Sequence, residues 1–247
     1  MTTQKNRPSL DPALLRGERP TKTLTEILAV DTRRLLEGAF PALTLTDREG
    51  EQLTSTSITA RMTAAGQLLH DRLGPDCIPQ LHRHTADTVR GFAPYVVAAI
   101  PALDLRERLD RVRESADDPH FGVREWAWLA VRAHVASDIE GAIAHLEAWT
   151  ADPSPRIRRF ATEATRPRGV WSAKIQKLLD APRLGLPLLE ALRADPEKYV
   201  QDSVANWIND AAKSRPQWAL DLCDRWRRES RGKSTERICT RALRSLK

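Results

Sequence analysis

One short phrase occurs three times in the second half of the chain, and it constrains the fold more than any other feature. It reads Asp-Pro, three variable residues, a branched apolar residue, and then Arg or Gln. Its copies begin at Asp118, Asp152 and Asp195, which lie 34 and 43 residues apart. An Asp-Pro pair is typical of a helix start, because the carboxylate caps free N–H groups and proline tolerates the first turn. The phrase therefore predicts a repeated pair of helices whose branched residue turns into the core.

A repeat of this length is similar to the HEAT repeat, in which stacked helix pairs bury each other's apolar faces. Glycine and proline fall largely at the joints between the helical segments, and no convincing period-two alternation lies between them. We therefore expect an all-α fold, an α-solenoid of HEAT-like helical repeats that curves around a concave face. Two or three weaker helix pairs should precede Asp118.

The first part of the chain has a different pattern. Residues 1–22 hold three prolines among polar residues and show no helical period, so we expect an irregular N-terminal arm. From Thr23 onward apolar residues recur at helical spacing, first over residues 24–36 and then over residues 58–69. We expect residues 23–247 to form a single HEAT-like repeat domain.

Composition narrows the class of protein. No apolar run reaches the ~18 residues that a membrane span needs, and no signal segment opens the chain. Cys77, Cys223 and Cys239 are widely spaced and odd in number, which argues against a disulfide framework and against zinc. We expect a cytoplasmic protein without a membrane partner, and the family resemblance described below implies the bacterial cytosol or nucleoid.

The positive charge lies at the C-terminal end. The chain carries a net charge of +6, and residues 214–247 alone account for it, so this end is a candidate contact for a polyanion. Arginine far outnumbers lysine, which suits bidentate contacts with phosphate. A coding bias toward GC-rich codons would give the same excess without any function.

General catalytic signatures are absent from the sequence. There is no phosphate-binding glycine loop, no dinucleotide fingerprint, no metalloprotease motif and no nucleophile elbow. His82 and His84 are two positions apart, which places them on different faces of a helix, so they do not predict a metal site.

Three carboxylates in largely apolar surroundings are the more informative candidates: Glu125, Glu163 and Asp210. All seven tryptophans follow residue 125, and some of them flank these acids. Aromatic faces beside acids can form a pocket for a cation. The alternative is structural, because such acids also cap helices or pair with arginines along a solenoid, as Asp118 and Asp152 could do with Arg124 and Arg158.

Three longer stretches then resemble a known family. Residues 120–128, 157–171 and 199–210 look like the AlkC branch of the HEAT-repeat (AlkC/AlkD-like) alkylbase DNA glycosylases. The resemblance runs from about Thr23 to Lys247 and is strongest from Gly91 onward. It implies a monofunctional DNA glycosylase of base excision repair, which hydrolyses the N-glycosidic bond of cationic bases such as 3-methyladenine and, in this branch, 3-methylcytosine.

The resemblance also implies partners and roles. It implies a monomer without metal or organic cofactor, acting on double-stranded DNA that contains alkylated bases and lies on the concave face. The implied catalytic acids are Asp210, Glu163 and Glu125, with Asp210 stabilising the oxocarbenium-like sugar. The implied lesion-binding walls are Trp128, Trp171, Trp207 and Trp126. Candidate contacts to the DNA backbone are Arg158, Arg159, Arg166 and Arg168, although Arg158 could equally be an arginine of the ladder between repeats.

One departure and two alternatives stay open at this point. Some relatives append a small β-sandwich after the repeats, and we expect its DNA contact here to be missing or replaced by the basic C-terminal end. A non-catalytic HEAT-repeat protein that binds branched or distorted DNA would use the same basic surface without needing the acids. A protein-binding scaffold would predict no affinity for DNA at moderate salt.

Overall fold

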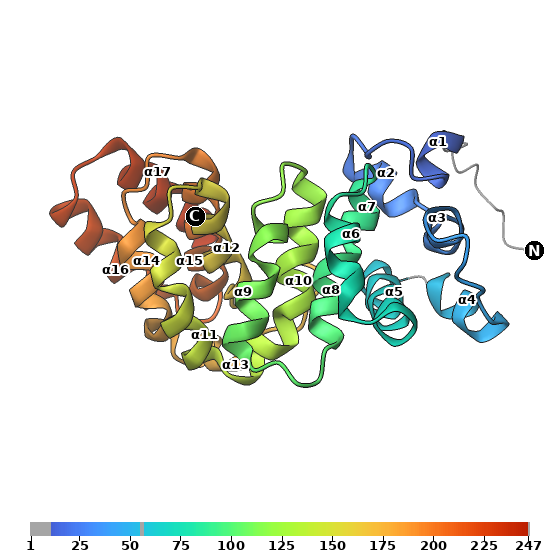
Figure 1. Ribbon diagram of the computed structural model, residues 1–247. Coiled ribbons are helices and arrows are strands. Elements are labelled where there is room, and N and C mark those ends of the chain that lie inside the picture. The colour runs from blue at the N-terminus through green and yellow to red at the C-terminus, as the bar shows by residue number, and fades with distance from the viewer. Residues whose placement is uncertain (1–10, 55–56, 247) are drawn as a thin grey trace, which may run out of the picture. The chain divides into compact units, whose positions relative to one another are not determined.

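The computed structural model describes residues 11–54 and 57–246, and all regular secondary structure in that part of the chain is helical. Successive helices are joined by turns and short loops (Figure 1). The all-helical class predicted from the sequence is confirmed. The chain divides into two compact units: unit 1 comprises Met1–Pro101 with His120–Trp126, and unit 2 comprises Ala102–Pro119 with Ala127–Lys247.

Unit 1 is built mainly from short helices. Its elements are α1 (Pro12–Leu15), α2 (Leu24–Ala29), α3 (Thr32–Ala39), α4 (Asp47–Leu53), α5 (Ile58–Leu73), η1 (Pro75–Cys77), α6 (Ile78–His82), α7 (Asp87–Arg90), α8 (Phe92–Ala99) and the start of α10 (Phe121–Ser137).

The apolar pattern over residues 24–36 is not one helix but two, because the chain breaks at Val30 and Asp31 caps α3 by accepting the N–H of Arg34. The pattern over residues 58–69 is a single helix, α5. It packs on α8 where Gly66 faces Tyr95, and a Cβ atom at Gly66 would lie 2.3 Å from the Tyr95 Cβ. Only glycine lets the two backbones approach this closely.

The region predicted as an arm carries one helical turn and a buried anchor. Residues 1–10 lie outside the described part of the chain, and Pro12–Leu15 form α1. The Thr21 N–H and hydroxyl donate to the buried carboxylate of Asp87 at 2.6 and 2.9 Å. The segment next to residue 22 is therefore tied to α7, while the domain boundary at that residue stays a prediction.

Unit 2 contains the repeats that the sequence phrase marks. Its elements are α9 (Leu105–Ala116), the rest of α10, α11 (Ile139–Leu146), η2 (Ala148–Ala151), α12 (Pro155–Ala164), α13 (Gln176–Asp180), η3 (Pro182–Gly185), α14 (Leu186–Leu192), α15 (Lys198–Ala212), α16 (Pro216–Glu229), α17 (Lys233–Ala242) and η4 (Arg244–Leu246).

The Asp-Pro phrases do precede helices, but the aspartate is not the residue that the helix starts from. In all three copies the helix begins three residues after the aspartate, at Phe121, Pro155 and Lys198. Asp152 and Asp195 instead accept the N–H two residues further on, which closes a tight turn before the helix. The branched residues Val123, Ile157 and Val200 are buried, as the phrase predicts.

Arginines link successive joints of unit 2. Arg158 donates to the Asp195 carboxylate from Nε at 2.6 Å and from Nη2 at 3.2 Å, and its Nη1 donates to the Asp152 carbonyl at 2.8 Å. The Arg113 guanidinium donates to the Asp152 carboxylate. We call Arg113, Asp152, Arg158 and Asp195 the joint ladder. The sequence offered a ladder as the alternative role of Arg158, with Asp152 as its partner; in the structure Arg158 contacts the carboxylate of Asp195, and the carboxylate of Asp152 contacts Arg113.

No helix within residues 11–54 and 57–246 is both long enough and apolar enough to cross a membrane. Cys77, Cys223 and Cys239 are buried free thiols.

Candidate active site

Two of the three predicted acids come together in unit 2, at the C-terminal ends of packed helices. Glu163 lies in the last turn of α12 and Asp210 in the last turn of α15, and these two helices pack against each other. A hydrogen bond of 2.7 Å between the Thr162 and Ser203 hydroxyls joins them within the buried seam. The side chains of both acids are almost fully buried, with exposed fractions of 3% for Glu163 and 5% for Asp210.

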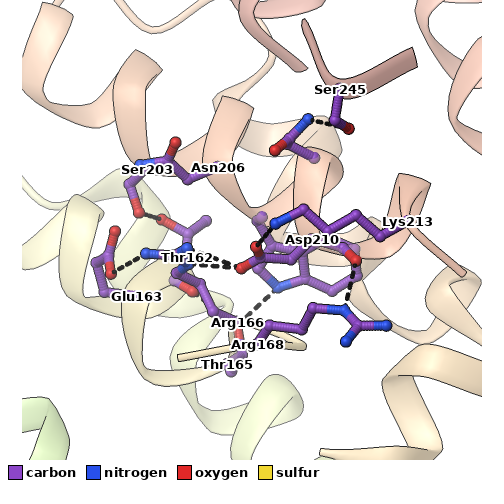
Figure 2. A network of polar contacts seen from close by, with 12 residues as sticks. Thr162, Glu163, Thr165, Arg166, Arg168, Ser203, Asn206, Asp210, Lys213 and Ser245 are labelled. Atoms are coloured by element: carbon purple, nitrogen blue, oxygen red, sulfur yellow. Dashed lines mark hydrogen bonds and ion pairs between the residues drawn. The ribbon is translucent and has the colours of Figure 1, made fainter. Parts of the chain in front are cut away.

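The guanidinium of Arg166 bridges the two acids (Figure 2). Its Nε donates to Asp210 Oδ2 at 2.8 Å, and its Nη2 lies 2.8 Å from the same oxygen. Its Nη1 donates to Glu163 Oε2 at 3.4 Å. Burial alone would lower the pKa of Arg166, but the two carboxylates outweigh it and raise that pKa above its ordinary value. The arginine is therefore a firmly charged partner of both acids.

The loop that carries Arg166 is fixed by a second, buried arginine. Arg132 of α10 donates from Nη1 to the Ala164 carbonyl at 2.8 Å and from Nη2 to the Arg166 carbonyl at 2.5 Å. Its Nη2 also lies 3.3 Å from the Ala173 carbonyl. Burial lowers the pKa of Arg132 to about 10, which leaves it charged at neutral pH. Arg132 thus shapes the connection between α12 and α13.

Asp210 lies in a setting that favours its neutral form. Burial raises the pKa of its carboxyl, and the charges of Arg166 and Lys213 oppose that rise without cancelling it. Lys213 Nζ is 3.8 Å from Asp210 Oδ1, and the lysine side chain is half exposed. The Oδ2 atom carries both Arg166 contacts, so Oδ1 is the less occupied oxygen.

Trp207 and Trp128 serve as packing residues. Trp207 is fully buried, donates from Nε1 to the Thr165 hydroxyl at 3.3 Å and covers Gly185, where a Cβ atom would lie 2.3 Å from the indole ring. Trp128 is also buried and lies over Gly169. Neither ring offers an open face to a ligand in this structure.

Trp171 differs from both. It follows the Arg166 loop, has an exposed fraction of 47%, and adopts a φ of 58°. A left-handed backbone is unfavourable for a bulky residue and costs of order 1–3 kcal/mol unless the surroundings impose it. The predicted wall formed by Trp171 is therefore an exposed indole on a constrained loop.

Glu125 and Trp126 belong to unit 1. Glu125 is half-buried on α10. Trp126 is buried, and its ring centroid lies 6.4 Å from that of Tyr95. Its indole N–H has no hydrogen-bond partner within the described residues.

The four predicted backbone arginines have different surroundings. Arg158 belongs to the joint ladder, and Arg166 bridges the acids. Arg159 lies 4.5 Å over the Tyr199 ring and 3.6 Å from Glu163 Oε1. Arg168 donates to the Asp210 carbonyl at 3.2 Å and to the Ser214 hydroxyl at 2.6 Å, so it lies next to the backbone of Asp210.

Sequence reasoning missed Arg132 and Lys213. The signal for Arg132 was a single arginine inside the apolar run of residues 126–135, where an unpaired charge would be costly. Lys213 gives no sequence signal, because a lysine just beyond a helix end is common on protein surfaces.

Comparisons with known proteins place this geometry in context. No protein-family model matches the chain. The uncharacterised protein YhaZ of Bacillus subtilis (strain 168) is 40% identical over 97 residues, which make up 39% of this chain and 27% of that protein. A solved structure of the Pseudomonas fluorescens alkylpurine DNA glycosylase AlkC, bound to DNA containing an abasic site analog, matches with a TM-score of 0.69 at 26% identity.

The AlkC match covers 95% of this chain but 64% of the AlkC chain, so this chain spans less than two thirds of that protein. The structure of AlkD2 from Streptococcus mutans matches with a TM-score of 0.61 at 18% identity, over 79% of this chain and 93% of AlkD2. The AlkD2 match concerns the fold alone, and it agrees with the AlkC match. The resemblance read from the sequence is confirmed: the chain is AlkC/AlkD-like, an α-solenoid of HEAT-like helical repeats.

Proposed function

We propose that this protein is a DNA glycosylase that releases cationic alkylated bases from double-stranded DNA. The observation that carries the proposal is the buried acid pair Glu163 and Asp210, held together around a cation. Support comes from the likeness to the glycosylase AlkC along 95% of this chain. The substrates we propose are 3-methyladenine and 3-methylcytosine nucleotides, and we propose that the protein acts as a monomer.

The chemistry explains why the reaction needs carboxylates but does not need a general acid to protonate the leaving base. A base alkylated at N3 already carries a positive charge, so it can leave without being protonated. When the N-glycosidic bond breaks, its electron pair goes to the base and neutralises that charge, while the sugar becomes oxocarbenium-like. Water then adds to the sugar carbon and loses a proton.

We assign Asp210 to the developing sugar cation and to the orientation of the attacking water. Among the described residues its Oδ1 atom contacts the Lys213 ammonium alone, at 3.8 Å, so we assign this oxygen to that role. Electrostatic groups of this kind are commonly worth about 3 kcal/mol or more. Glu163 holds the base cation.

For DNA contacts we propose Trp171 and Arg168. Trp171 is the predicted wall whose ring is exposed, so it can stack on a base or a sugar. Arg168 lies beside Asp210, and its guanidinium can bind a DNA phosphate. Arg158 is better explained by the joint ladder, and we remove it from the set of backbone contacts.

The test is the release of bases from methylated duplex DNA, with the products identified by chromatography. The wild type is expected to release 3-methyladenine, and Asp210→Asn is expected to lose at least about a hundredfold in single-turnover rate. The matched control is Asp202→Asn, which changes an acid on the same helix that pairs with Arg237 and Arg241 instead. Its rate should stay within about twofold of wild type.

Two results would contradict the proposal. Full activity after Asp210→Asn combined with Glu163→Gln would remove the mechanism. Tight binding of branched or distorted DNA by the wild type without any base release would favour the non-catalytic alternative.

A further inference from the structure

The position between the two acids is already filled by a cation of the protein itself. The Arg166 guanidinium contacts Asp210 at 2.8 Å and Glu163 at 3.4 Å, and its own side chain is only 12% exposed. It therefore occupies the place next to Asp210 where the proposed reaction develops positive charge.

The side chain of Arg166 can move without moving its loop. Its backbone carbonyl is held by Arg132 at 2.5 Å, and the carbonyl of Ala164 just before it is held by the same guanidinium at 2.8 Å. The fixed parts are thus backbone atoms anchored from α10. The contacts to the two acids are made by the flexible side chain, which rotates about its own bonds.

The physics of buried charge decides which ligand can replace this guanidinium. A carboxylate removed from water is stable only with a counter-ion or a proton, and removing one partner of a buried pair is strongly unfavourable. A neutral nucleotide offers the acids no charge in return for Arg166, so it leaves the guanidinium in place. A cationic nucleotide restores the charge that it displaces.

We propose that Arg166 is a resident counter-ion that a cationic nucleotide must displace, and that this exchange makes Arg166 a specificity-determining residue. The inference rests on the proposed function, since it concerns the same acid pair. The acid pair then discriminates by charge rather than by base shape, without a hydrogen bond to the edge of the base, and competition from Arg166 limits how strongly a cation is preferred.

The displaced guanidinium is expected to bind a DNA phosphate, since a guanidinium and a phosphate form strong paired hydrogen bonds. The exchange then conserves the number of ion pairs. After bond cleavage the base is neutral, so Asp210 and Glu163 lose their ligand cation. Arg166 can return to them as the products leave.

The charged groups that face Asp210 also predict a pH signature. They come from the α12–α13 region, the end of α15, α10 and η4: Glu163, Arg166, Lys213, Arg132 and Arg244. Arg166 opposes the rise in the Asp210 pKa that burial causes. Removing it should raise that pKa further, so the ionised form of Asp210 is lost at a higher pH.

The test compares two duplexes that differ only in charge at the lesion. One contains a pyrrolidine abasic nucleotide, whose ring amine is protonated at neutral pH, and the other contains the neutral tetrahydrofuran nucleotide of the same size. The ratio of their dissociation constants cancels the phosphate contacts that the two duplexes share. In Arg166→Gln at pH 8 the preference for the cationic duplex should rise about tenfold over wild type.

On acidification this preference should fall off at a higher pH in Arg166→Gln than in wild type, a shift that a purely structural arginine would not cause. Arg166→Lys keeps the counter-ion, so its preference should stay within about twofold of wild type. Arg237→Gln is the matched control, because it removes an arginine that pairs with Asp202 of α15 instead of the acid pair, and it should change little.

If Arg166→Gln does not fold, Arg166→Gln with Glu163→Gln removes one charge of each sign and leaves Asp210 without its guanidinium. Its preference should rise as well. An unchanged or lower preference in the folded variant would overturn the inference. Because binding does not depend on bond cleavage, a risen preference in a protein that releases no base would uphold the exchange and refute the glycosylase.

Discussion

An arginine–aspartate ion pair lies at each end of α12, and the two pairs differ in how fully the aspartate oxygens are contacted by protein groups. At its start, Asp195 receives Nε and Nη2 of Arg158 at 2.6 and 3.2 Å, and also the N–H of Glu197 at 2.9 Å. At its end, both Arg166 contacts fall on one oxygen of Asp210, and the other oxygen has an ammonium at 3.8 Å.

This difference separates a structural pair from one that can bind a ligand. The Arg158–Asp195 pair has its hydrogen-bonding capacity filled by protein groups, so it gains nothing from a ligand. Asp210 retains an underused oxygen, although its side chain is only 5% exposed. A buried carboxylate oxygen with few partners is unfavourable, and a cationic ligand bound at that oxygen would offset this cost in free energy.

The largest expected effect is on stability at the joint ladder. Arg158→Met keeps the apolar stem but leaves the buried Asp195 carboxylate without its arginine, so the free energy of unfolding should fall by about 3 kcal/mol. Denaturant unfolding measures this change. The rate of base release per folded molecule should not change. A slower rate at unchanged stability would show that the Arg158–Asp195 pair is not purely structural.

A second expected effect is on the pH dependence of base release. Because burial raises the pKa of Asp210, its carboxylate is lost above the ordinary aspartate range near pH ~4. The single-turnover rate should fall by about tenfold per pH unit once the pH drops below that pKa. The same raised pKa means that the folded state binds this proton more tightly than the unfolded chain.

That proton therefore stabilises the fold at low pH, and its contribution is lost as the pH rises through the folded-state pKa. The stability of Asp210→Asn, measured against wild type, should consequently improve between pH ~4 and neutral pH. A wild-type rate that stays flat down to pH ~4 would show that Asp210 is not the group that must be ionised.

The smallest expected effect is on the salt dependence of DNA binding. Arg168→Gln should weaken binding to all duplexes alike and reduce the slope of log affinity against log salt by about 1, the value for one lost phosphate contact. Arg111→Gln on α9 is the control, since it removes an exposed arginine with the same change in net charge. Equal slopes for the two variants would remove Arg168 from the DNA contacts.

The sequence predicted the repeats well because their signal is local. Asp152, Pro153 and Ile157 lie within one turn and one helix start, so their spacing alone reports the structure. Even so, α12 begins three residues after Asp152 and not directly after it, because the aspartate closes the preceding turn and Ser154 caps the helix. Turn closure and helix capping use the same residue types, and spacing does not separate them.

The site was harder to predict because its parts lie far apart in the chain. Glu163 and Asp210 meet only because α12 packs on α15, and the spacing of residues left a structural role open for both. The resemblance to a family, not the residue pattern, singled them out. The bridge formed by Arg166 depends on a loop shape that Arg132 imposes from another helix, and no local pattern reports such a contact.

The tryptophans illustrate the same limit. The family resemblance treats Trp128, Trp171 and Trp207 alike, as walls of one cleft, although only Trp128 and Trp207 lie near an acid in the sequence. The structure buries two of them and exposes the third, since Gly169 and Gly185 leave room for indole rings and the left-handed backbone at Trp171 turns its ring outward.

The exposure of Trp171 gives this protein an intrinsic optical reporter. The other six tryptophans are buried or half-buried, so a water-soluble quencher such as iodide will act mainly on Trp171, which follows Arg166 in the same connection between α12 and α13. Steady-state fluorescence of the unlabelled protein can therefore follow occupancy of the Arg166 loop by DNA. Loss of quenching on addition of a duplex would mark the arrival of a ligand at this loop in real time.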